Sequence, residues 1–269
     1  MNAVLDAFWR ATVTCLHPRL LLWSLLPLVL AGGALGVLSW FWWDEALMAV
    51  RATLERFDLI ATLLDRLAVH GFNQLRAFLA PLLLVMGALP LVIVTSLLLT
   101  GMFLSPVAVG LVARRRFAAL ERRQGASWWA SLGWSLVCTL AALLALAASV
   151  PLWFVLPLAV LLPPLVWGWL TYRVLAFDAL AAHASAEERR TVLRSKRWPL
   201  LAMGLVCGWL GALPALLWAL GTATLIFAPF LLVASVWLYT MVFAFAACWF
   251  AHYALAELQR LREKETPPS

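Results

Sequence analysis

Four long stretches of the chain contain no aspartate, glutamate, lysine or arginine, and this distribution of charge restricts the fold more than any other feature. The uncharged blocks are residues 20–43, 77–113, 127–172 and 198–256. A helix that crosses the hydrocarbon core of a bilayer needs about 20 consecutive apolar residues. The first block therefore fits one span, the second one long span, and each of the last two a helical hairpin. The pattern predicts up to six membrane-embedded segments.

Composition excludes a soluble globular domain. Hydrophobic residues make up 65% of the 269 residues and charged residues only 12%, whereas charged residues account for roughly 25% of ordinary soluble domains. A soluble fold of this size leaves much of its surface in water and cannot hide so much apolar area. No hydrophilic linker divides the chain, so we expect a single all-α integral membrane domain over residues 1–269.

The basic residues predict the orientation of these segments, because cytoplasmic loops are enriched in Lys and Arg. Sixteen of the 20 Lys and Arg residues fall on one side of the predicted membrane and four on the other. The sixteen lie in residues 1–19, in 114–126, in a helix or loop at 173–197 and in a tail at 257–269. We expect a multi-pass protein of the inner (cytoplasmic) membrane with both termini in the cytoplasm. Anionic lipid headgroups explain the net charge of +7 better than nucleic acid does.

The loop at 44–76, predicted to lie outside, has the pattern of an amphipathic helix. Leu47, Val50 and Leu54 begin an apolar stripe with spacings near three and four, while Arg51 and Glu55 form an i,i+4 pair on another face. We expect a helix that lies on the outer membrane surface or extends the first spans. A partner-binding helix is the alternative.

The two longest blocks, 127–172 and 198–256, predict apolar hairpins whose tips are marked by proline. Pro151 and Pro157 lie near the middle of the first block, and Pro214 and Pro229 flank the middle of the second. Proline breaks a helix because it lacks a backbone donor. Either each hairpin crosses the bilayer completely, or it re-enters from the same side, which requires protein or water to satisfy the irregular backbone. The residues alone leave both interpretations open.

Sequence motifs for catalysis are absent, so we expect no enzyme. The chain has no nucleophile elbow, no phosphate-binding glycine loop and no HExxH motif. Its four cysteines and four histidines lack the spacing of metal ligands, which predicts neither a metal site nor a cofactor. His252 is the single ionisable residue within the four blocks, and we expect it at the membrane interface. The paired glycines Gly204 and Gly208 favour close helix packing within the chain.

Three segments of the chain resemble the CysZ-type sulfate permeases, a family grouped with the etoposide-induced membrane proteins. The first, FWRATVTCLHPRLLLWSLLPLVL, enters the first span; the second, FLSPVAVGLVARRRFAALERRQG, contains Ser105-Pro106 and Glu121. The third is LTYRVLAFDALAAHASAEERRTVLRSKRWPLLAMG, where Phe177-Asp178 follows an apolar hairpin. The resemblance implies two long spanning helices, two hairpins that penetrate the bilayer part-way, and a homo-oligomer.

The activity implied by the resemblance is movement of sulfate across the inner membrane. We therefore expect a permease or channel for a small inorganic anion, with sulfate as the first candidate and a non-transporting membrane scaffold or assembly factor as the alternative. Without charged residues in the spans, the anion would contact backbone amides and hydroxyls at the start of a half-helix. The candidates are Gly221, Thr222 and Thr224, with Arg114, Arg115 and Arg116 as a cytoplasmic electrostatic funnel. Alternatively, Gly221 only ends a helix and the arginines only fix the topology.

Overall fold

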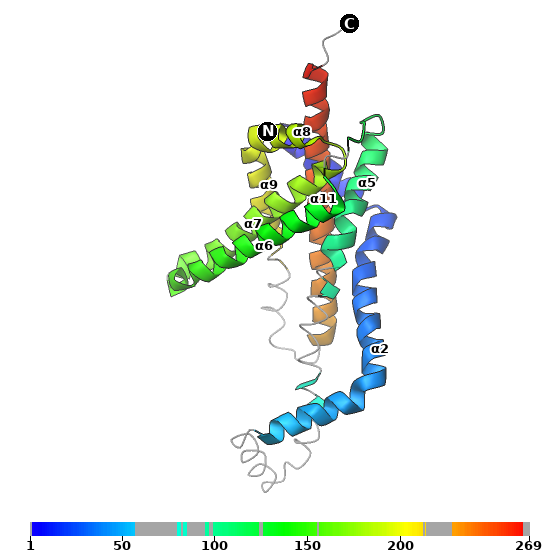
Figure 1. Ribbon diagram of the computed structural model, residues 1–269, viewed down its shortest axis with the longest axis vertical. Coiled ribbons are helices and arrows are strands. Elements are labelled where there is room, and N and C mark those ends of the chain that lie inside the picture. Colours follow the sequence, from blue (N-terminus) through cyan, green and yellow to red (C-terminus); the bar gives the residue numbers. More distant parts are fainter. Residues whose placement is uncertain are drawn as a thin grey trace. The chain divides into compact units, whose positions relative to one another are not determined.

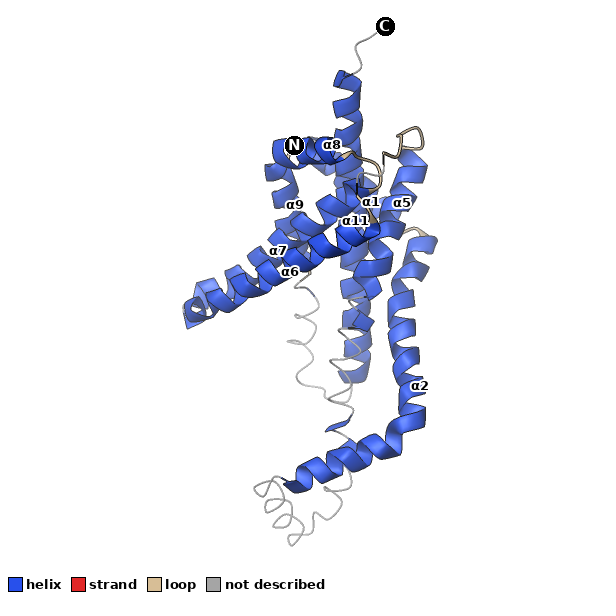
Figure 2. Ribbon diagram, in the orientation of Figure 1, coloured by secondary structure: helices blue, strands red, loops and turns tan. Residues whose placement is uncertain are grey.

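The computed structural model describes residues 2–56, 80–81, 83–84, 95–96, 99–123, 126–154, 156–211, 213 and 228–265. This part of the chain contains helices and no strand, which confirms the all-α prediction (Figure 2). Four of its helices are long and apolar enough to cross a membrane: Leu20–Thr53, Trp129–Leu152, Val160–Ala181 and Val233–Glu265. The chain forms two compact units, the first from Met1–Leu25 with Leu99–Ser269 and the second from Leu26–Leu98.

The second unit is described mainly through helix α2 (Pro18–Arg56), which begins in the first unit. The helix runs without a break through the predicted span at 20–43 and into the predicted outer segment at 44–76. Toward its C-terminal end it changes direction (Figure 1). Residues 57–76 of the outer segment lie outside the described residues, so its position at the membrane surface stays a prediction.

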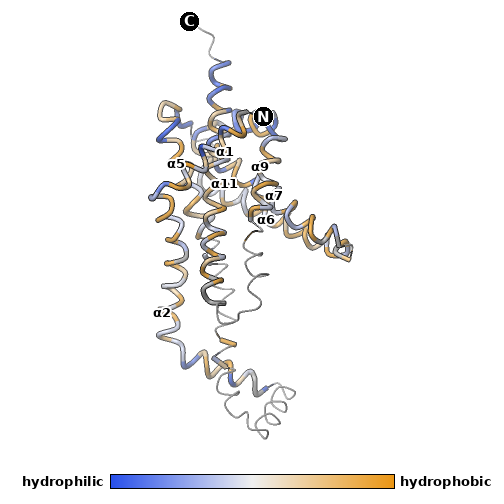
Figure 3. Tube along the Cα trace, turned by 180° about the vertical axis from the view of Figure 1, so that it is seen from behind, coloured by the Kyte–Doolittle hydropathy of each residue, from blue (hydrophilic) through white to orange (hydrophobic). Residues whose placement is uncertain are grey.

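In the first unit, helix α1 (Asn2–Cys15) lies across the long helix α11 (Ala228–Glu265), as Figures 1 and 3 show from opposite sides. Ala7 and Ala11 are buried where the two helices meet. Beside them, the Phe8 ring makes edge-on contacts with Phe245 and Trp249, at centroid distances of 5.2 and 5.1 Å. Helix α1 was not predicted as a separate element.

A short π-helix, η1 (Thr100–Leu104), leads directly into helix α5 (Ser105–Arg116). Proline lacks the backbone donor and crowds the carbonyl four residues earlier. For Pro106 that carbonyl belongs to Met102, inside the wider π turn, so the proline explains the local departure from α-helical geometry. This region forms the end of the long span predicted over 77–113.

Helices α6 (Trp128–Ser149) and α7 (Leu156–Ala181) form a hairpin joined by the 3₁₀ turn η2 (Val150–Phe154). The turn falls at Pro151, where the sequence predicted a break, and Phe154 at its end is 94% exposed. In the first unit the hairpin runs obliquely to α11, and its tip stops short of the far end of that helix (Figure 1). Both helices are long and apolar enough to cross a membrane, so the complete and the part-way interpretations both stay predictions.

Helix α7 continues to Ala181, beyond the end predicted at residue 172. Buried apolar residues continue at helical spacing after Tyr172, namely Leu175, Ala176, Ala179 and Leu180. The predicted cytoplasmic segment 173–197 therefore begins inside α7 and contains only one complete helix, α8 (Ala186–Ser195). The uncharged block ends at residue 172, whereas the helix ends at Ala181.

Helix α9 (Arg197–Leu210) packs against α7 through glycines. A Cβ atom at Gly208 would lie 2.6 Å from the Pro164 carbonyl oxygen, and one at Gly168 would lie 2.7 Å from the Leu205 Cα. A Cβ at Gly204 would also overlap the Gly168 carbonyl. The prediction that Gly204 and Gly208 serve packing within the chain is confirmed at this crossing. The tip of the hairpin predicted at 198–256 lies outside the described residues.

Candidate functional site at the charged end of the first unit

Hydrophilic residues gather at one end of the first unit, where α1, α5, α8 and the C-terminal turns of α11 meet (Figure 3). Ion pairs join the four basic segments that the sequence placed on one side of the membrane. Arg116 at the end of α5 lies 3.3 Å from Asp6 of α1, and both Arg123 and Arg262 pair with Glu188 of α8. The shared side of these segments is thus supported by direct contacts.

The three predicted funnel arginines occupy the last turn of α5, where the negative end of the helix dipole favours cations. Arg116 pairs with Asp6, and Arg115 Nη2 lies 2.6 Å from His17 Nε2. Arg114 is exposed and has no ion pair or hydrogen bond to the described residues. Arg114 is thus unengaged among the described residues, while Arg116 connects α5 to α1.

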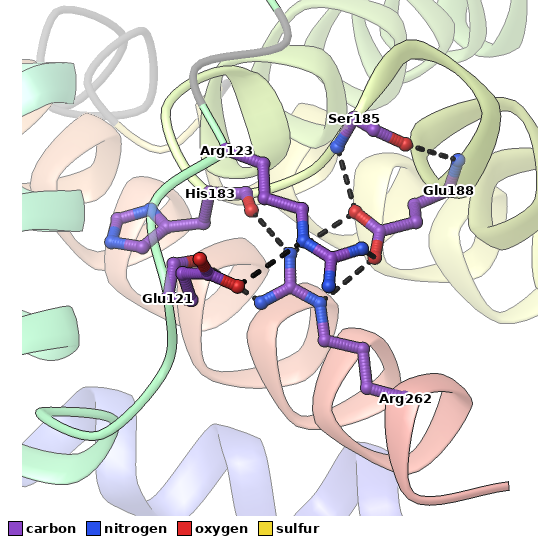
Figure 4. A network of polar contacts seen from close by, with 6 residues as sticks. All are labelled: Glu121, Arg123, His183, Ser185, Glu188 and Arg262. Atoms are coloured by element: carbon purple, nitrogen blue, oxygen red, sulfur yellow. Dashed lines mark hydrogen bonds and ion pairs between the residues drawn. The ribbon is translucent and has the colours of Figure 1, made fainter. Parts of the chain in front are cut away.

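Glu188 is the centre of a polar network at this end (Figure 4). Arg262 of α11 donates to both of its carboxylate oxygens, at 2.8 and 3.1 Å, and Arg123 donates at 2.9 Å. Glu188 also completes a capping box with Ser185, so the same side chain begins helix α8. Arg262 further donates to the backbone carbonyls of Glu121 and His183.

The electrostatics of the network follow from these contacts. The hydrogen bond from Arg262, the backbone amide of Ser185 and the charges of both arginines lower the pKa of Glu188 to about 2, although burial opposes the shift. Burial and the positive charges of Arg122 and Arg262 lower the pKa of His183. Because Arg262 uses its donors within the protein, the network is suited to holding helices together rather than to binding a solute.

Residues 7–221, about four fifths of the chain, match the family described as sulfate transporter CysZ/etoposide-induced protein 2.4. The chain belongs to this family. Searches of curated proteins and of solved structures returned no match. The CysZ/etoposide-induced match includes most of α1, all of α5, the α6–α7 hairpin and α8, and with them Arg116 and Glu188 of the charged end.

The predicted anion contacts Gly221, Thr222 and Thr224 lie outside the described residues, so their role stays a prediction. Within the described part of this CysZ-family chain, no group of three His, Cys, Asp or Glu side chains is arranged to hold a metal ion. Sequence reasoning also placed His252 at the membrane interface. Its side chain is buried within the protein, with Nε2 3.1 Å from Thr14 Oγ1 of α1, and its place at the interface stays a prediction.

Sequence reasoning missed Asp178, which lies in the last turns of α7. Helix α7 continues past the predicted block end at residue 172, so the apolar stretch Val160–Ala181 includes this carboxylate near its C-terminal end. Its Oδ2 accepts a hydrogen bond from Ser105 Oγ of α5 at 3.2 Å. The apolar spacing beyond residue 172 was the signal that could have placed Phe177-Asp178 inside a helix.

Proposed function

We propose that this protein is an inner-membrane permease or channel for a small inorganic anion, with sulfate as the first candidate. We further propose that it works as a homo-oligomer in the lipid bilayer, without a cofactor and without catalysing a reaction. Membership of the sulfate transporter CysZ/etoposide-induced protein 2.4 family is the observation that carries this proposal.

The charged end of the first unit supports an anionic solute. Basic residues outnumber acidic ones in the segments that meet there, and a positive surface raises the local concentration of anions. Arg114 is unpaired among the described residues, so its guanidinium can meet an arriving anion without breaking a contact seen in the structure. Arg115 and Arg116 extend the same positive turn of α5.

We place the membrane-embedded contacts at Gly221, Thr222 and Thr224. A hydroxyl group and an unpaired backbone amide can both donate to an oxyanion, and neither requires a buried positive charge. The Gly-Thr-Ala-Thr sequence lies between Pro214 and Pro229, where the second long block is expected to interrupt its helices.

Uptake into proteoliposomes tests the proposal. Purified protein in liposomes should admit radiolabelled sulfate faster than empty liposomes, and Thr222→Val combined with Thr224→Val should slow the uptake roughly tenfold because each change removes a donor. Thr53→Val is a matched control, since its exposed hydroxyl donates to the carbonyl of Ala49 in its own helix. It should leave uptake unchanged.

Two results would count against parts of the proposal. Uptake no faster than in empty liposomes, for sulfate and for a panel of other anions, would favour the alternative of a membrane scaffold or assembly factor. Wild-type uptake that the double threonine variant does not slow would keep the conduit but remove Thr222 and Thr224 from the anion path.

A further inference from the structure

Helix α8 and the first residue of α9 carry a row of exposed arginines. Arg190 and Arg194 lie one turn apart on the same face of α8, and Arg197 follows where α9 begins. The opposite face of α8 is buried through Glu188 and Val192. One side of this helix therefore holds the charged end together, while the arginine row faces outward.

The arginine row has no carboxylate partner within the described part of the chain. The neighbouring Lys196 does have one, because it pairs with Glu257 of α11 at 3.1 Å. The only exposed acidic residue of α8 is Glu187, so the outer face keeps a net positive charge. The Arg197 guanidinium lies over the Trp198 ring, 5.2 Å from its centre, and this contact leaves its in-plane donors able to bind an anion. The charge of the row is thus available to a partner from outside the chain.

The chain enters an apolar helix immediately after this row. Residues 198–256 contain no Asp, Glu, Lys or Arg, and α9 is apolar over Arg197–Leu210. Between the two helices Lys196 departs from helical geometry, with φ −110° and ψ 20°, so α8 runs across the direction of α9 (Figure 2). Trp198 begins the uncharged block and is 68% exposed, and tryptophan favours the membrane interface. The row therefore lies where lipid headgroups are expected.

Helix α1 independently indicates the same level of the membrane. Its residues Leu5, Trp9 and Val13 are exposed and spaced four apart, which forms an apolar stripe. Ala7 and Ala11 on another face are buried against α11. A helix with one apolar side exposed, lying across a spanning helix, is typical of the boundary between headgroups and acyl chains. Both α1 and α8 thus place the membrane surface at the charged end of the first unit.

The chemistry of the row fits a phosphate group attached to a lipid. Guanidinium groups bind phosphate oxygens through paired hydrogen bonds, and anionic lipids attract basic segments on the cytoplasmic side. We propose that Arg190, Arg194, Arg197 and Trp198 form a binding surface for anionic phospholipids of the cytoplasmic leaflet. The exposed tryptophan at the start of an apolar helix favours a lipid over an acidic protein segment, which has no acyl chains to place beside it. This inference goes beyond the proposed anion transport and does not depend on it.

Binding at this surface should also stabilise the fold. The inner face of α8 carries Glu188, which pairs with Arg123 and with Arg262 of α11. A lipid held on the outer face binds the folded helix and not the unfolded chain, so it shifts the equilibrium toward the folded protein. Anionic lipid should therefore strengthen the charged end through α8.

Competition between two lipids with the same acyl chains tests the proposal. The full-length protein in detergent is mixed with equal amounts of phosphatidylglycerol and phosphatidylcholine, and native mass spectrometry measures the ratio in which they bind. Wild type should prefer phosphatidylglycerol. Arg190→Gln, Arg194→Gln and Arg197→Gln should each lower the preference roughly fivefold, because each removes one arginine from the headgroup layer.

Two further variants separate a specific surface from total charge. Arg51→Gln removes the same charge from an exposed position of α2, in the predicted outer segment, and should retain the wild-type preference. Replacing all three arginines of the row by lysine keeps the positive charge, so this variant should prefer phosphatidylglycerol more strongly than the triple glutamine variant does.

Four results would overturn the proposal. Wild type that binds both lipids equally has no anionic lipid surface, and a preference that the triple glutamine variant keeps lies elsewhere. Displacement of phosphatidylglycerol by an equal concentration of glycerol phosphate would indicate a site for free phosphate. Binding of a hexaglutamate peptide in place of phosphatidylglycerol, lost in the triple glutamine variant, would assign the row to an acidic protein segment.

Thermal unfolding in detergent provides a second measurement. Phosphatidylglycerol should raise the unfolding midpoint of the wild type more than phosphatidylcholine does, and the triple glutamine variant should respond equally to both. If that variant does not fold, the wild type alone still decides, because its lipid preference should fall as the ammonium acetate concentration rises and screens the charges. A preference that does not change with salt would exclude the arginine row as its source.

Discussion

Glu188 joins three segments of the charged end through contacts with Arg123, Arg262 and the backbone of Ser185. Each of these partners stabilises the ionised carboxylate, while the helix cap requires an acceptor at the same position. The single side chain therefore fixes the start of α8 and the C-terminal turns of α11 together.

Glu188→Gln should lower the free energy of unfolding by about 3 kcal/mol at neutral pH, because two arginines lose a charged partner at a largely buried site. The folded-state pKa of about 2 lies below the ordinary value of 4.5. The stabilisation is therefore complete above pH 4.5 and disappears as the pH falls toward 2. Thermal unfolding in detergent should show the difference between wild type and variant shrinking over that range.

Glu121→Gln is the matched control, since its carboxylate is 73% exposed and among the described residues pairs only with Arg123, at 3.4 Å. We expect a change below about 0.5 kcal/mol. An equal loss of stability in both variants, or a Glu188→Gln difference that does not change with pH, would show that Glu188 does not act through its ionised carboxylate.

At the scale of elements, the packing of α9 against α7 depends on how closely the two helices approach each other. Backbone atoms of α7 occupy the space where side chains at Gly204 and Gly208 of α9 would begin. Lipid tails are as apolar as the helix surfaces, so close packing must supply much of the attraction between membrane helices. The two helices can approach this closely only if the residues at the crossing have no side chain, as glycine does.

Gly204→Ala should destabilise the protein by about 2–3 kcal/mol, because the added methyl group meets the Gly168 backbone and the Tyr172 side chain. Gly133→Ala is the matched control on α6, since nothing lies within 4 Å of its Cβ position. Replacing that helical glycine should leave stability unchanged or slightly higher. Unfolding midpoints in detergent measure both variants, and equal midpoints would contradict close packing at the α7–α9 crossing.

The depth of the α6–α7 hairpin can be measured at its tip. If the hairpin penetrates part-way, Phe154→Cys should be protected from membrane-impermeant maleimides added to either side of the membrane. The four native cysteines are buried and give little background. Glu187→Cys and Asp44→Cys are the labelling controls, for the predicted cytoplasmic side and the predicted outer side respectively. Labelling of position 154 from the outer side would establish a complete crossing.

For the whole molecule, the four segments that carry most of the Lys and Arg residues meet at one end of the first unit, as the contacts of Asp6 and Glu188 show. Both chain termini belong to this group of segments, through α1 and the end of α11. Since positively charged segments remain cytoplasmic, the two termini should lie on the cytoplasmic side together.

Reporter fusions test that orientation. Green fluorescent protein should fluoresce when fused to either end, because it folds in the cytoplasm. Alkaline phosphatase fused at the same positions should be inactive, because it is active only outside the cytoplasm. Phosphatase activity at one terminus alone would mean an odd number of crossings. That result would contradict the paired hairpins.

The sequence alone determined the membrane class, the uncharged blocks and the shared side of the basic segments, because apolar length and charge position are local properties that a bilayer selects directly. Only the tertiary structure decided which polar groups become partners. Asp178 could be read from the sequence, but the two serines that contact it, Ser105 and Ser131, come from two other helices. Likewise, Arg262 binds Glu188 although the two residues are far apart in the sequence. Contacts between distant residues depend on how helices cross, and the pattern of apolar residues does not specify that geometry.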